Sequence, residues 1–83
     1  MQTSQLQMIW ASKPDCSRPV AEFWIGQDDL WFTMFVDDSS RLVMVEVLPP
    51  TIERTTQILD FKQMERLMEQ AKRELVAMAA SPG

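Results

Sequence analysis

The chain has 83 residues, of which 46% are hydrophobic and 24% are charged, and its formal net charge is -4. This length and composition exclude a disordered or fibrous chain and predict one small globular domain over residues 1–83. The acidic balance disfavours nucleic-acid binding, which depends on clustered cations, because the Lys and Arg residues are scattered among acids.

The N-terminal segment begins with polar residues and contains no long apolar run. A secretion signal or a membrane span would need such a run, so we expect neither, and we expect the protein to be cytoplasmic. Cys16 is the only cysteine and the chain has no histidine, so no internal disulfide and no metal site is expected.

The next part of the chain predicts an antiparallel meander. Alternating apolar residues (Leu6, Met8 and Trp10) indicate a first strand within residues 1–12. Two prolines predict a loop over residues 13–19, and a second strand follows from Val20 to the turn that begins at Gly26. A third strand and a second turn then lead to the β-branched run 41–48, which ends at two prolines.

The last part of the chain predicts a helix. Residues 55–59 favour a short edge strand, and Asp60 stands where a helix N-cap is expected. An apolar stripe at helical spacing then follows, made by Met64, Leu67, Met68, Ala71, Leu75 and Met78. The fold class predicted is α+β, with an antiparallel β-meander of four to five strands (about 4–59) and one long C-terminal α-helix (about 61–79) packed on one sheet face.

The stretch DDLWFTMFVDD, residues 28–38, is apolar on both faces of the predicted third strand. Strict alternation points Leu30, Phe32, Met34 and Val36 toward the helix and leaves Trp31 and Phe35 on the opposite, second face. Neighbouring strands extend that apolar second face with Trp24, Leu42, Met44 and Leu48. Either the first strand and the 13–19 loop fold over this face, or another protein covers it.

Pairs of acidic residues bracket the same strand. They are good turn formers, and they would also make an acidic rim that attracts a basic partner. The predicted protein-binding residues are therefore Trp24, Trp31, Phe35, Met44, Asp28, Asp29, Asp37 and Asp38.

The residues that enzymes of most classes use are missing. There is no His or Tyr, the lone cysteine has no neighbouring base, and the two glycines exclude a phosphate-binding loop. We therefore expect no catalytic residue, no cofactor and no metal.

The sequence favours a non-catalytic protein-binding module, acting as a small inhibitor, an immunity-like or antitoxin-like factor, or an accessory subunit. Its partner is expected to be another protein with a basic surface, and the chain is expected to form a homodimer as well. Two alternatives stay open. One is a single-stranded nucleic-acid-binding module that stacks bases on Trp24, Trp31 and Phe35, and the other is a small structural homodimer subunit.

Overall fold

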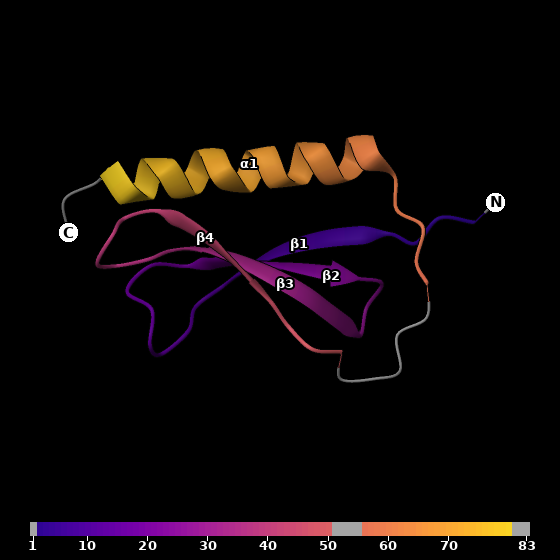
Figure 1. Cartoon of the computed structure of the whole chain (residues 1–83), viewed down its shortest axis with the longest axis horizontal. Helices are drawn as coiled ribbons and strands as arrows, with labels where there is room; N and C mark the ends of the chain where they lie inside the picture. Colours follow the sequence, from indigo (N-terminus) through magenta and orange to yellow (C-terminus); the bar gives the residue numbers. More distant parts are fainter. Residues whose placement is uncertain (1, 51–55, 81–83) are drawn as a thin grey trace.

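The computed structural model describes residues 2–50 and 56–80, and it has the predicted α+β architecture. Strands β1 (Leu6–Ala11), β2 (Val20–Ile25), β3 (Asp29–Val36) and β4 (Val43–Val47) form one antiparallel sheet in the order β1-β2-β3-β4. The C-terminal helix α1 (Phe61–Ala80) lies along one face of this sheet (Figure 1). The predicted meander and its packing against a single long helix are confirmed.

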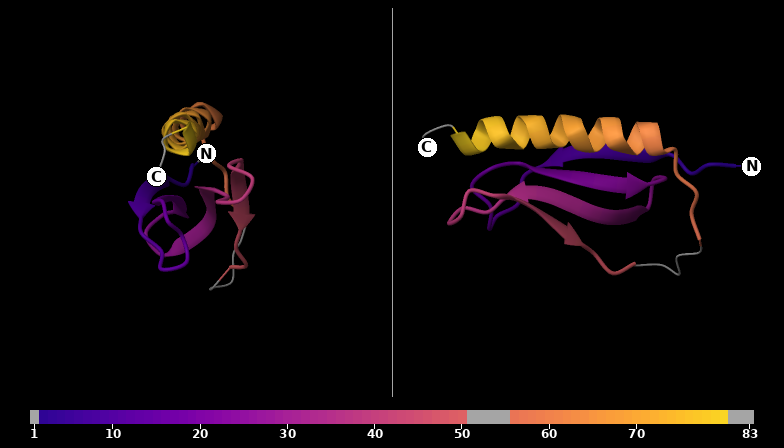
Figure 2. Two further views of the ribbon diagram at one scale, coloured as in Figure 1. Left: turned by 90° about the vertical axis from the view of Figure 1, so that its left-hand side faces the viewer. Right: turned by 45° about the horizontal axis from the view of Figure 1, so that its top comes forward.

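The sheet curves, and α1 lies on its concave side (Figure 2). The space between them is filled by the core, in which the rings of Phe23 and Phe32 stack with centroids 4.4 Å apart. Ala71 and Leu75 close the core from the helix and have no exposed surface. The apolar core residues that are buried are Leu6, Ala21, Phe23, Ile25, Phe32, Met34, Val36, Ala71 and Leu75.

The helix begins where the sequence predicts. The backbone N–H of Lys62 donates to Asp60 Oδ1 at 3.0 Å, and the N–H of Met64 donates to the Asp60 carbonyl at 3.0 Å. Asp60 is therefore the N-cap that satisfies the first free N–H groups of the helix. Among the described residues, no helix is long and apolar enough to cross a membrane.

The fifth strand expected over residues 55–59 is wrong for the part that the structure describes. Residue 55 lies outside the described residues, and Leu59 forms only an isolated parallel bridge with Ser4. The Ser4 N–H donates to the Ile58 carbonyl at 2.8 Å, which covers the N-terminal end of the β1 edge. The edge strand was predicted from local β-branched residues, and such residues do not by themselves supply a neighbouring strand to pair with.

The alternation predicted for the third strand is broken by a β-bulge. Phe23 pairs with Phe32 and Trp24 pairs with Leu30, so Trp31 is the extra residue on β3. A bulge turns the neighbouring side chains to the other face. Leu30 therefore shares the face of Trp24, whereas Trp31 packs against the core and meets the Phe32 ring edge-on at 4.8 Å. The predicted positions of Leu30 and Trp31 were wrong.

Strand β4 is the least covered part of the sheet. The first residues of β4 lie near α1. The strand then diverges from the helix, so the C-terminal end of β4 lies farthest from α1 (Figures 1 and 2). Exposure follows this divergence, because Val43 is half-buried, Val45 is 50% exposed and Val47 is 68% exposed. All three side chains lie on the helix side of the sheet, since they pair with the buried residues Val36, Met34 and Phe32.

Because Phe32 is buried and Phe61 is exposed, replacing each by alanine should change the stability of the protein by very different amounts. Phe32→Ala removes a buried ring and should lower the free energy of unfolding by about 3 to 5 kcal/mol. The matched control is Phe61→Ala, since that ring is 67% exposed and its loss should cost less than about 1 kcal/mol. Urea denaturation at one low protein concentration measures both. Equal losses in the two variants would contradict this description of the core.

Candidate protein-binding surface

The second face of the sheet, opposite α1, is partly covered by the chain itself. Lys13, Asp15 and Cys16 of the loop after β1 line a small cavity of about 110 Å³ over this face. Below the loop, Val20 and Thr33 are each only 1% exposed. The explanation that the loop folds over the second face is supported, but the first strand does not join it there, because β1 extends the sheet beside β2.

The predicted aromatic residues of the second face are therefore less available than expected. Trp24 and Phe35 are half-buried, and the Trp24 indole N–H donates to Glu22 Oε1 at 3.3 Å. Trp31 packs against the core on the other side of the sheet. Of the four predicted apolar binding residues, Met44 on β4 is exposed, at 44%.

The setting of Cys16 favours the neutral form of its thiol. Partial burial raises the pKa of the Cys16 thiol, and the neighbouring Asp15 carboxylate raises it further. The neutral thiol is a poor nucleophile. Cys16 also lines the cavity between the 13–19 loop and the sheet.

The two acidic pairs do not form one exposed rim. Asp29 is the first residue of β3 and is only 7% exposed, so its predicted place in the rim was wrong. Its neighbour Asp28 is exposed in the turn. The rim prediction assumed that both residues belong to the turn, but β3 starts one residue earlier and the bulge turns Asp29 inward.

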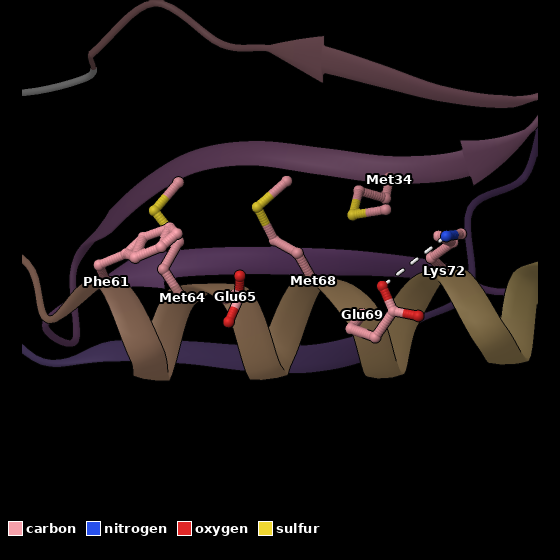
Figure 3. A pocket seen from close by; sticks show the side chains of 7 residues that line it. All are labelled: Met34, Phe61, Met64, Glu65, Met68, Glu69 and Lys72. Atoms are coloured by element: carbon pink, nitrogen blue, oxygen red, sulfur yellow. Dashed lines mark ion pairs between the residues drawn. The ribbon is translucent and has the colours of Figure 1, made fainter.

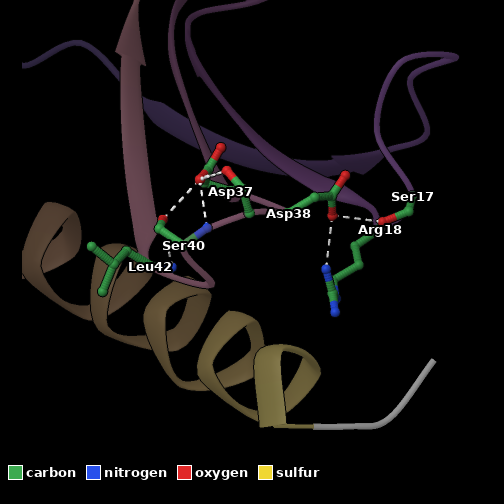
Figure 4. A network of polar contacts seen from close by, with 7 residues as sticks. Ser17, Arg18, Asp37, Asp38, Ser40 and Leu42 are labelled. Atoms are coloured by element: carbon green, nitrogen blue, oxygen red, sulfur yellow. Dashed lines mark hydrogen bonds and ion pairs between the residues drawn. The ribbon is translucent and has the colours of Figure 1, made fainter.

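The second acidic pair is held by the β3–β4 turn (Figure 4). Asp37 Oδ2 accepts from the backbone N–H of Ser40 at 2.9 Å and from its hydroxyl at 2.8 Å. Asp38 Oδ1 pairs with Arg18 at 2.9 Å and accepts from the Ser17 hydroxyl at 2.7 Å. These contacts shape the turn and tie the 13–19 loop to it, which is the turn-forming role that the sequence also allowed.

Exposed apolar side chains follow β4 on both of its faces. On the helix side they include Val45 and Val47, and on the second face they include Met44. Leu42, just before the strand, is 62% exposed. Four large apolar side chains within six consecutive residues are thus open to solvent at one edge of the sheet.

Within residues 2–50 and 56–80, no strand pairs with the outer edge of β4. The hydrogen bonds to β3 show which residues of β4 face that edge. Leu48 N–H donates to the Trp31 carbonyl and Asp37 N–H donates to the Leu42 carbonyl, both at 2.9 Å. Even-numbered residues of β4 therefore direct their backbone groups toward β3. Because the direction alternates along a strand, Val43, Val45 and Val47 direct theirs outward.

An apolar groove separates the first half of α1 from β3 (Figure 3). Its volume is about 370 Å³, and its lining includes Met34 from β3 with Phe61, Met64 and Met68 from the helix. Glu65, Glu69 and Lys72 border it, and Lys72 lies 3.7 Å from Glu69. Flexible methionine side chains suit a surface that adapts to a partner.

We call the exposed side chains of β4 and this groove together the β4–α1 surface, with residues Leu42, Met44, Val45, Val47, Met34, Phe61, Met64 and Met68. Sequence reasoning named Met44 as a binding residue and placed Leu42 beside it on the apolar second face, but it missed the other residues. The unbroken apolar run 42–45 was a usable signal, because a strand covered on one face only should alternate.

No protein family, curated protein or solved structure matches the chain.

The Asp37 network predicts a pH effect on stability. Hydrogen bonds from Ser40, and then from Ser39, lower the pKa of Asp37 in the folded chain. The stabilisation is therefore complete above the ordinary pKa of an unfolded aspartate and is lost as pH falls through the lower folded value. Urea denaturation over an acidic pH series should show the advantage of the parent over Asp37→Asn shrinking as pH falls. A difference that is constant with pH would contradict it.

Proposed function

We propose that the protein is a non-catalytic protein-binding module and that its binding site is the β4–α1 surface. In this role it acts as a small inhibitor, an immunity-like or antitoxin-like factor, or an accessory subunit. The observation that carries the proposal is the exposure of large apolar side chains on both faces of β4 beside an apolar groove. The groove replaces the second face, which the 13–19 loop partly covers, as the main contact region.

Covering the exposed apolar side chains of the β4–α1 surface would stabilise a complex, because it removes apolar surface from water. Complete burial of one Val, Leu, Met or Phe side chain contributes about 1.5 to 3 kcal/mol. Phe61 and Val47 are both more than half exposed, so a partner that covers them gains a large part of that amount for each. Aromatic residues and methionine are also enriched at the centres of protein interfaces.

The charge of the chain supports a partner with a basic surface. The net charge is -4, and Glu65 and Glu69 border the groove. Charges at the rim of an interface mainly accelerate association and exclude partners of like charge. A basic partner would therefore approach the groove faster than an acidic one, in the cytoplasmic setting that the sequence favours.

Single-stranded nucleic-acid binding has less support than it had from the sequence. That alternative needs Trp24, Trp31 and Phe35 together on one open face. The bulge moves Trp31 to the core side, and the other two are half-buried.

A charge placed at the mouth of the groove tests the proposal. The tagged parent, incubated with an extract of the source cells and cross-linked, should capture a protein through contacts at the groove. Phe61→Lys should reduce that capture by roughly tenfold or more, the change expected for a loss of about 1.4 kcal/mol. Mass spectrometry of the cross-linked peptides measures both the amount and the site.

The matched control is Gln70→Lys, which adds the same charge at an exposed helix position outside the groove. It should capture as much as the parent does. Equal capture by all three chains, or recovery of nucleic acid without protein, would contradict the proposed function.

A further inference from the structure

We infer that the β4 edge is occupied by a second copy of this chain, paired antiparallel about a two-fold axis at Val45. The inference rests on the proposed function in that it takes the β4–α1 surface as a protein-binding surface, and it assigns the strand part of that surface to self-association. The groove beside α1 then remains for a different protein. Pairing of this kind would continue the sheet from one copy into the other.

The hydrogen-bonding phase of β4 permits this axis. Val43, Val45 and Val47 direct their backbone groups outward, as the bonds of Leu42 and Leu48 to β3 require. With the axis at Val45, that residue exchanges both bonds with its own copy, and Val43 pairs with Val47 of the second copy. Every outward-directed residue of the strand is then used.

Other axes lose bonds. An axis at Val43 would pair Val45 with residue 41, and Arg41 has a φ of 61°, which is outside the extended region. An axis at Val47 would pair Val45 with Pro49, which has no N–H to donate. Axes at Met44 and Glu46 keep the same phase but meet the same two obstacles, because they would pair Val47 with Arg41 and Val43 with Pro49 respectively. The Val45 axis is therefore the one that uses all three outward-directed residues.

The side chains fit the same axis. The three valines of each copy lie on the helix side, where they would form one continuous apolar row across the junction. On the second face, Glu46 would lie opposite Met44 of the second copy instead of opposite another Glu46. This arrangement avoids directly opposed like charges, which matters for a chain with a net charge of -4.

The β1 edge offers less to a second copy. Its N-terminal end is covered by the Ser4 and Leu59 bridge. Its outward-directed residues Leu6, Met8 and Trp10 have side chains that pack in or against the core. An unprotected edge with exposed apolar side chains is the usual place for strand addition, and β4 meets that description better than β1.

A stable interface buries roughly 1,000 Å² or more in total. A strand of five residues is only about 17 Å long. Apolar side chains on both of its faces therefore have to contribute, and on β4 they are exposed on both faces. Closed two-fold contacts are also the commonest way for identical chains to associate.

Site-specific disulfide formation tests the register, in a Cys16→Ser background that removes the native thiol. In the proposed pair, the two Cα atoms of residue 45 lie about 5.5 Å apart, which is within the range that a disulfide spans. Val45→Cys should therefore give a covalent dimer under mild oxidation. Val43→Cys and Val47→Cys are matched controls on the same face, and each should remain monomeric because its own copy lies about 13 Å away along the strand.

Proline substitution tests whether the outer edge holds the dimer together. Val45→Pro removes an outward N–H and leaves the bonds to β3 in place, so the variant should stay folded but sediment at the chain mass of 9.6 kDa instead of twice that value. Met44→Pro removes an inward N–H from the pair with Phe35, and it should destabilise the fold itself. Circular dichroism and sedimentation separate the two effects.

The inference is overturned if the parent sediments as a monomer at high micromolar concentration, or if a folded Val45→Pro variant remains dimeric. It is also overturned if Val43→Cys or Val47→Cys cross-links as well as Val45→Cys does. A monomer that still captures a protein in a Phe61-dependent manner would remove this inference and leave the proposed function intact. A Val45-centred dimer that captures no protein would do the reverse.

Discussion

A straight helix cannot cover a twisted sheet completely, and this geometric limit determines where the protein is closed and where it is open. Helix α1 has 20 residues and is therefore about 30 Å long. Adjacent strands rotate by about 20 to 25°, so the fourth strand is turned by roughly 60 to 75° from the first. The helix can bury the concave side of β1, β2 and β3, but β4 diverges from it (Figure 1). The exposed edge is thus a consequence of the same packing that makes the core.

The bulge at Trp31 is the second feature that decides which apolar surfaces are open to solvent. It lets the strand that reads as apolar on both faces place Trp31 with Phe32 on the core side. The second face loses its central aromatic residue and is partly closed by the 13–19 loop, whose Arg18 pairs with Asp38. What was expected to be an aromatic binding face is therefore a partly covered one, and the open apolar surface lies at β4.

The elements of the fold could be predicted because each has a local physical signal. The helical spacing of Met64 and Leu75, and the cap at Asp60, define α1 without knowledge of any other part of the chain. The apolar runs and turn residues define the four strands in the same way. Helical spacing, capping residues, apolar runs and turn residues all depend on residues that are close together in the sequence, so they can be identified without the structure.

The candidate binding surface could be predicted only in part, because it depends on how distant strands meet. The bulge is set by the pairing of β3 with β2, so alternation within β3 alone misplaced Trp31 and Leu30. The exposure of Val47 depends on the divergence of β4 from α1, which no local pattern records. Met44 was identified because it lies in an apolar run, whereas Phe61 resembles an ordinary first residue of a helix.

Amide hydrogen exchange along β4, followed by NMR at several protein concentrations, tests the central claim most directly. The claim is that alternate backbone groups of β4 face a second copy. The account predicts that the amides of Val43, Val45 and Val47 exchange fast in dilute samples and become protected as the concentration rises. The amides of Met44 and Glu46, which face β3, should be protected throughout. Rapid exchange of the three valine amides at every concentration would contradict it.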